Sequence, residues 1–138
     1  MRFDPAFAID GATELWLGTT LFTTRPEEML DMGSGRSTLI MARHAALFGG
    51  HVTAFEDRSA SAECTRAALR DEGLVADIID APIRDDGSFD ASCPRLDFVF
   101  VDGPANYLPP GDRRAFALEG VLPRVRSRAV IMVDDAKR

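Results

Sequence analysis

The segment Met29–Thr38 constrains the fold more than any other part of the chain. An apolar run closes on Asp31, Gly33 and Gly35 follow within four residues, and a helical pattern of apolar side chains begins near Ser37. This order is typical of a strand, a tight turn and the first turn of a helix. The glycines allow backbone angles and a close ligand approach that side chains would obstruct. We therefore expect a ligand at the helix N-terminus, whose free N–H groups favour an anionic or electron-rich group, while the acid suits a cationic or hydroxyl-bearing one.

Strand and helix patterns alternate along the rest of the sequence. The expected strands are about 28–32, 51–55, 74–79, 96–101 and 129–133, and the expected helices are about 11–24, 37–48, 59–71 and 111–124. Short helices between short apolar strands predict right-handed crossovers and a doubly wound parallel α/β sheet. Trp16 and Leu17 are expected to pack the leading helix against that sheet.

Composition and charge exclude several classes of function. The 138 residues, 46% of them apolar, suit one domain with a real core and argue against disorder. A net charge of −6 argues against a nucleic-acid substrate held on a basic surface. The arginines at 113, 114, 124, 126 and 128 are interpreted as a solvated face over a helix and the turn after it.

Signals for a membrane or an oxidising compartment are missing from the sequence. No apolar run approaches the roughly 20 residues that span a bilayer. The first residues are acidic and interrupted by Pro5, unlike a signal peptide. Cys64 and Cys93 have no metal-like spacing and form no disulfide framework. We therefore expect a cytoplasmic protein with no membrane partner.

Acidic residues stand where every expected strand ends. They are Asp31, Glu56 with Asp57, Asp80, Asp102, and Asp134 with Asp135. The carboxyl ends of parallel strands share one edge of the sheet, where ligands bind. Glu56 lies 21 positions after Gly35, near the spacing at which an acid accepts both hydroxyls of a ribose. Asp57 is the weaker candidate because it lies beyond the strand end.

The glycine turn distinguishes between nucleotide-binding motifs. A dinucleotide fingerprint has a third glycine where this chain has Thr38, and a phosphate-binding P-loop has a lysine that is absent here. The acid ahead of two glycines resembles the first motif of the class I S-adenosylmethionine-dependent methyltransferases. That resemblance implies a Rossmann-like sheet of order 3-2-1-4-5 in a single domain over 1–138, with a leading helical segment in 1–25. It also implies a cofactor site formed by Asp31, Gly33, Ser34, Gly35, Ser37, Thr38, Glu56, Asp80 and Asp102, with Asp80 near the adenine.

The acids after the last two strands resemble those of the metal-dependent O-methyltransferases, the catechol and caffeoyl-coenzyme A type and the related sugar O-methyltransferases. In these families such acids bind magnesium, which holds the acceptor and lowers the pKa of the oxygen to be methylated. The resemblance, over about 28–135, implies methyl transfer to an oxygen of a small-molecule substrate. It also implies that Asp102, Asp134 and Asp135 bind a metal and that Asp102 is catalytic. Three converging carboxylates would otherwise repel.

The chain departs from that pattern in two places. Ala105 stands where the catechol type has a lysine base, and the sequence ends soon after the fifth strand, so the C-terminal antiparallel strands of these families are expected to be missing. Two alternatives therefore stay open. One is an NAD-dependent oxidoreductase that uses the same turn and Glu56, and the other is a cofactor-binding or scaffold module without catalysis.

Overall fold

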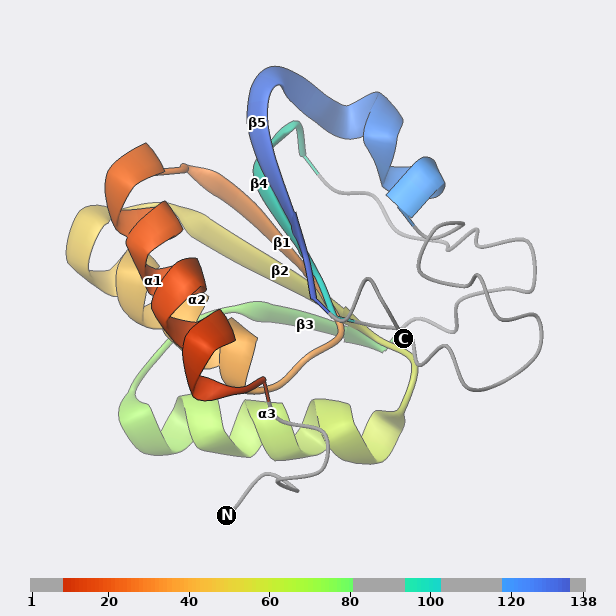
Figure 1. Cartoon of the computed structure of the whole chain (residues 1–138). Helices are drawn as coiled ribbons and strands as arrows, with labels where there is room; N and C mark the ends of the chain where they lie inside the picture. Colours follow the sequence, from red (N-terminus) through yellow and green to blue (C-terminus); the bar gives the residue numbers. More distant parts are fainter. Residues whose placement is uncertain (1–8, 81–93, 103–117, 135–138) are drawn as a thin grey trace.

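The structure is a computed structural model, and it describes residues 9–80, 94–102 and 118–134 (Figure 1). Its elements in chain order are α1 (Gly11–Thr24), β1 (Glu28–Met32), α2 (Arg36–Phe48), β2 (His51–Glu56), α3 (Ser59–Glu72), β3 (Asp77–Asp80), β4 (Leu96–Val101), the 3-10 helix η1 (Leu122–Arg124) and β5 (Val125–Val133). Strands and helices thus alternate as the sequence predicts. None of the described helices is long and apolar enough to cross a membrane.

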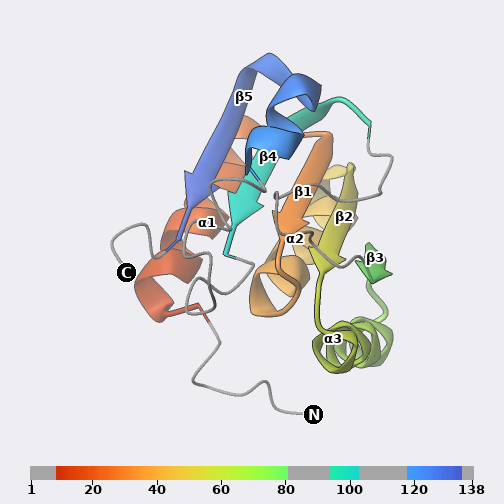
Figure 2. The same cartoon turned by 90° about the vertical axis from the view of Figure 1, so that its right-hand side faces the viewer.

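The five strands form one parallel sheet in the order β3-β2-β1-β4-β5, which confirms the predicted doubly wound topology (Figure 2). β1 lies at the centre, where Asp31 pairs in register with Ala54 of β2 and Phe100 of β4. The order reverses on either side of β1, because the chain runs from β1 to β2 and β3 and then returns to β4. In open α/β sheets, ligands bind at the carboxyl ends of the strands beside such a reversal, which here is the carboxyl end of β1.

Apolar side chains cover both faces of the sheet. The face toward α1 and α2 buries Leu17, Leu21, Met29, Met41, Val52, Phe98 and Phe100. The opposite face buries Leu30, Met32, Phe55, Leu96, Val99, Val101 and Val121, on the side where η1 lies in Figure 1. Successive residues of β1 therefore point to opposite faces of the sheet, and apolar side chains cover both faces. The central strand can thus hold the residues at its carboxyl end in fixed positions.

Several sequence-based boundaries and contacts are wrong. β3 begins at Asp77 instead of 74, because Leu74 packs into the cluster between α2 and α3 and does not join the sheet. Trp16 is 67% exposed, whereas Leu17 is fully buried as expected. The buried pair on α1 is Leu17 and Leu21, spaced four residues apart, so the adjacent Trp16 is turned away from the sheet.

The last predicted helix and strand also differ from expectation. Residues 118–121 are helical and η1 follows, while the rest of the predicted 111–124 helix lies largely outside the described residues. β5 begins at Val125 instead of 129. Arg126 and Arg128 consequently lie in the edge strand and not in a turn, and Arg126 pairs with Asp97 at 2.7 Å.

Candidate functional site

A glycine turn leads from β1 into α2 at the carboxyl edge of the sheet. The backbone N–H of Gly33 donates to the carbonyl of Phe55 at 2.8 Å, which extends the β1–β2 ladder one residue beyond β1. Gly33 has φ 106°, a conformation that side chains disfavour, so the glycine is required by the turn itself. The first turn of α2 follows, with its N–H groups at the same edge.

Two hydroxyls of α2 bind the acid that precedes the turn. Thr38 Oγ1 donates to Oδ2 of Asp31 at 2.6 Å, and Ser37 Oγ donates to the same oxygen at 2.7 Å. Thr38 Oγ1 also accepts the N–H of Gly35 at 3.1 Å. The side chains of Ser37 and Thr38, which the sequence assigns to a cofactor, are thus engaged with Asp31. A ligand at the helix N-terminus would therefore contact the backbone N–H groups of these two residues and not their hydroxyls.

Asp31 is fully buried, and its Oδ1 has no hydrogen-bond partner among the described residues. Burial raises the pKa of its carboxyl to about 8, and the hydrogen bonds from Thr38 and Ser37 only partly offset this. The nearby charges of Asp102 and Glu56 raise the pKa further. A cationic donor at Oδ1 would satisfy the unpaired oxygen and favour the ionised carboxylate. The group therefore fits a positively charged ligand.

Glu56 ends β2 beside the glycine turn, and Ser34 binds it twice. The N–H and the hydroxyl of Ser34 both donate to Oε2 of Glu56 at 2.9 Å, while the N–H of Arg58 donates to Oε1 at 3.1 Å. Burial raises the pKa of Glu56, and these hydrogen bonds oppose that rise. A carboxylate has about four lone-pair sites, so this one has acceptor capacity left for a ligand.

Sequence reasoning missed the residue behind Ser34. Thr65 of α3 is fully buried, and its Oγ1 lies 3.1 Å from Ser34 Oγ. The two residues are separated by 31 positions, and Thr65 lies in an unremarkable alanine-rich helix. No motif or spacing in the sequence indicates this contact, since it depends on how α3 packs beside the turn.

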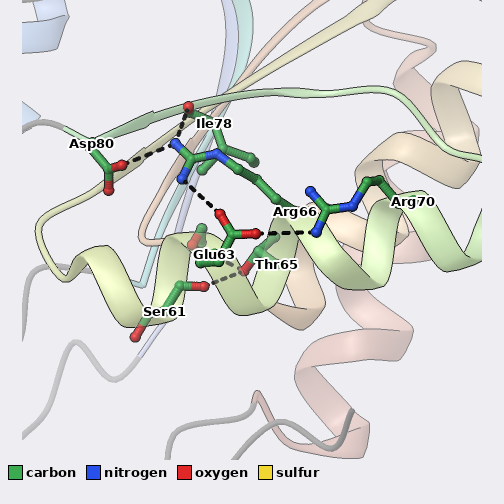
Figure 3. A network of polar contacts seen from close by, with 8 residues as sticks. Ser61, Glu63, Thr65, Arg66, Arg70, Ile78 and Asp80 are labelled. Atoms are coloured by element: carbon green, nitrogen blue, oxygen red, sulfur yellow. Dashed lines mark hydrogen bonds and ion pairs between the residues drawn. The ribbon is translucent and has the colours of Figure 1, made fainter.

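Asp80 ends β3 directly beside Glu56, because the two residues are paired in the β2–β3 register. Arg66 of α3 donates from Nη2 to Oδ2 of Asp80 at 3.1 Å and to the carbonyl of Ile78 at 2.9 Å. Figure 3 shows that Glu63 bridges Arg66 and Arg70 on the same helix, with contacts of 3.6 and 3.1 Å. The guanidinium of Arg66 thus holds the carboxylate of Asp80, the acid that the sequence predicts near an adenine.

Asp102 and Asp134 follow the paired ends of β4 and β5. The N–H of Asp102 donates to the carbonyl of Met32 at 3.1 Å, and the N–H of Asp134 donates to the carbonyl of Val101 at 3.0 Å. Both residues therefore continue the hydrogen bonding of the sheet. Asp134 Oδ1 also accepts the hydroxyl of Thr13 in α1 at 3.2 Å. Asp135 lies outside the described residues. Within the described ranges no group of three or more His, Cys, Asp or Glu side chains could hold a metal.

The two histidines lie away from this edge. His44 is buried in α2 with its ring 4.9 Å from that of Phe48, and burial lowers its pKa. His51 opens β2 at the amino edge, where its ring nitrogens lie 3.3 Å from Glu28 and 2.9 Å from Asp77. The acids, the glycine turn and the first turn of α2 therefore make up the candidate site.

Comparisons with known proteins show the same fold in several solved structures. Solved structures of similar fold include the S-adenosylhomocysteine-bound methyltransferase PaMTH1 of Podospora anserina (19% identity, TM-score 0.75, covering 96% of this chain and 56% of that one). An O-methyltransferase from Bacillus cereus in complex with S-adenosylhomocysteine is also similar (20% identity, TM-score 0.72, covering 94% of this chain and 58% of that one). A third is the O-methyltransferase TomG of Streptomyces achromogenes in complex with S-adenosylmethionine (19% identity, TM-score 0.70, covering 97% of this chain and 64% of that one).

The chain thus spans less than two thirds of each of these three proteins. None of the curated proteins compared with it matches. The model of the methyltransferase domain family matches residues 30–136. That match takes in the glycine turn and the strand-end acids, and it covers well over half of the sequence. On this evidence the chain belongs to the methyltransferase domain family.

Proposed function

We propose that this chain is an S-adenosylmethionine-dependent methyltransferase domain that acts on an oxygen of a small molecule. The family match supports methyl transfer, and the similar structures named above are bound to S-adenosylmethionine or its demethylated product. One observation carries the proposal for the cofactor. The buried, unpaired Oδ1 of Asp31 lies beside a glycine turn and a helix N-terminus, which together suit a zwitterionic amino-acid group.

In this proposal the turn and the first turn of α2 hold the methionine part of the cofactor. Asp31 accepts from its ammonium group, which favours the ionised form of the carboxyl. The N–H groups of Ser37 and Thr38 in the first turn of α2 face its carboxylate. The N–H groups of Gly33, Ser34 and Gly35 already donate within the chain, so the backbone of these residues lines the site without donating to the ligand. The hydroxyls of Ser37 and Thr38 support the site indirectly, because they already bind Asp31.

The adenosine part is assigned to the ends of β2 and β3. Glu56 accepts from the ribose with the one lone pair of Oε1 that Ser34 and Arg58 leave available. Asp80, paired beside it in the sheet, lies near the adenine and accepts from its amino group. The register of β2 and β3 supports this order, since it makes the two acids neighbours.

The acceptor is assigned to the ends of β4 and β5. The bound cofactor would supply a methyl group on a sulfonium. In the transfer an O–C bond would form to the deprotonated acceptor oxygen as the C–S bond breaks, and S-adenosylhomocysteine would be the leaving group. Asp102 is the proposed catalytic residue, because it follows the strand next to β1 and so belongs to the same edge as the proposed cofactor site. The chain contributes chiefly by aligning the two reactants and by favouring loss of the acceptor proton.

Magnesium is a further part of the proposal. Asp102, Asp134 and Asp135 would hold it through carboxylate oxygens, the ligands that this cation prefers. When bound, the metal would lower the pKa of the acceptor oxygen. Asp102 and Asp134 continue neighbouring strands, which lie about 5 Å apart, and this supports their sharing one cation.

Calorimetric titration with S-adenosylhomocysteine and with NAD tests the cofactor assignment. We expect S-adenosylhomocysteine to bind and NAD not to bind, because Thr38 replaces the third glycine that dinucleotides need. Binding of NAD alone would favour an oxidoreductase. Binding of neither ligand would favour a module that has lost its cofactor.

A further inference from the structure

A line of hydroxyl groups runs from α3 through the glycine turn to Glu56. Thr65 Oγ1 lies 3.1 Å from Ser34 Oγ, and Ser34 Oγ lies 2.9 Å from Oε2 of Glu56. Thr65 is fully buried and Glu56 is only 7% exposed. Three elements far apart in the sequence therefore meet in one buried polar contact.

The direction of these hydrogen bonds follows from the number of protons. Ser34 has one hydroxyl proton and gives it to the carboxylate of Glu56, which only accepts. Its oxygen is then free to accept from Thr65. The hydroxyl of Thr65 also reaches the carbonyl of Ser61 at 3.0 Å, so its single proton is shared between two acceptors. The line thus points from α3 toward the acid.

This contact limits the conformations of Ser34. Without a donor behind it, the serine hydroxyl can turn to other staggered positions, and only its backbone N–H would still hold Oε2. A donor from Thr65 favours the one rotamer in which the serine binds the acid. Linked hydrogen bonds of this kind strengthen one another in a buried site. The orientation of the Glu56 carboxylate therefore depends on a residue that lies beyond its own contacts.

We propose that Thr65 is a positioning residue that acts through Ser34 to fix Glu56 as the acceptor of ribose hydroxyls. The proposal rests on the proposed function, because it takes an adenosine-containing cofactor as the ligand. It assigns to α3 a part in the recognition of the ribose, although Thr65 itself contacts no ligand. Selectivity for a ribose with its hydroxyls should then be reduced when the Thr65 hydroxyl is removed.

The test compares two ligands in matched variants. Calorimetry measures the affinity of S-adenosylhomocysteine and of its analogue that lacks both ribose hydroxyls, and the ratio of the two affinities reports the ribose contact. Thr65→Val keeps the shape but removes the hydroxyl, and it should lower this ratio about fivefold, the equivalent of one hydrogen bond. Thr65→Ser keeps the hydroxyl and should stay within about twofold of wild type, well below the change for one lost hydrogen bond.

Thr53→Val is the matched control. Thr53 is buried in the middle of β2, and the same substitution there removes a hydroxyl with no link to Ser34. It should leave the ratio unchanged. Ser34→Ala should act like Thr65→Val, and the double variant should be no worse than Ser34→Ala, because both substitutions break one pathway. If Thr65→Val does not fold, Thr65→Ala, which also removes the hydroxyl, decides the outcome and should lower the ratio to the same extent.

Three results would overturn the proposal, and they differ from one another. A wild-type ratio near one means that Glu56 does not read the ribose. An unchanged ratio in folded Thr65→Val, with only a lower melting temperature, means that Thr65 is purely structural. Failure of wild type to bind S-adenosylhomocysteine at all refutes the proposed function, and the positioning role with it.

Discussion

Thr38 and Asp31 share a 2.6 Å hydrogen bond across the glycine turn, and the same Thr38 oxygen accepts the N–H of Gly35. The threonine thus ties the acid at the end of β1 to both the turn and α2. This explains why a residue other than glycine occupies the position after the turn. The contacts of the Thr38 side chain stabilise the turn, and this side chain fills the space that a third glycine would leave empty.

Removing this contact should destabilise the fold. In Thr38→Val the buried carboxyl of Asp31 loses one donor and the N–H of Gly35 loses its acceptor. The free energy of unfolding should fall by about 1–3 kcal/mol, as measured by urea denaturation. Thr38→Ser keeps the hydroxyl and is the control. Equal midpoints for wild type and Thr38→Val would show that the two contacts contribute nothing to stability.

The raised pKa of Asp31 predicts a pH-dependent stability. The pKa is about 8 in the folded chain against 3.8 ordinarily, so the folded state binds this proton more tightly. The stabilising contribution is complete below about pH 4, is lost as the pH rises and reaches zero above about pH 8. Within that window the free energy of unfolding should fall by up to about 1.4 kcal/mol per pH unit.

Asp31→Asn tests this prediction, because the amide has no such titration. Urea denaturation at pH 5, 6, 7, 8 and 9 gives the free energy of unfolding of wild type and variant. In the difference between the two, the contributions of other titrating groups such as Glu56 largely cancel. The variant should gain stability relative to wild type up to about pH 8 and then no more. A difference that does not vary with pH would show that the Asp31 carboxyl has an ordinary pKa.

The sequence carried enough information for the sheet but not for the side-chain contacts. Apolar segments that end in acids predict the strands, whereas the reversal of strand order at β1 is predicted only from the resemblance to the methyltransferases. The exposure of Trp16 depends on which face of α1 turns inward, and Leu17 and Leu21 together settle that. The link from Thr65 to Ser34 depends on tertiary packing across 31 residues, which no local pattern encodes.

Glu56→Gln should weaken the binding of S-adenosylhomocysteine. The amide keeps the shape but replaces one acceptor oxygen by a donor, so a hydrogen bond to a charged group is lost. We expect a loss of about 1.5–3 kcal/mol by calorimetry. Asp71→Asn removes an exposed acid from the far end of α3 and is the matched control. Unchanged affinity in folded Glu56→Gln would remove Glu56 from the site.

Asp80→Asn should reduce selectivity for the adenine amino group. Arg66 holds one oxygen of Asp80, and the proposed role of the acid is to accept from that amino group. The preference for S-adenosylhomocysteine over its deaminated inosine analogue should fall about tenfold, the equivalent of about 1.4 kcal/mol. Asp77→Asn changes the same residue type at the opposite end of β3 and should leave the preference intact. An equal effect of both substitutions would show a general loss of charge.

The metal proposal predicts a cation-dependent stability that one substitution abolishes. If Asp102, Asp134 and Asp135 share magnesium or calcium, a chelator leaves mutually repelling carboxylates and lowers the melting temperature. Asp134→Asn removes a charged ligand but can still accept the hydroxyl of Thr13, so it should eliminate the cation effect while keeping the contact with α1. Thr13→Val is the converse control, because it removes that contact and keeps all three acids. It should lower the melting temperature with and without cation by the same amount. Identical melting of wild type with cation and with chelator would exclude a stabilising metal, and an equal cation effect in Asp134→Asn would place the cation elsewhere.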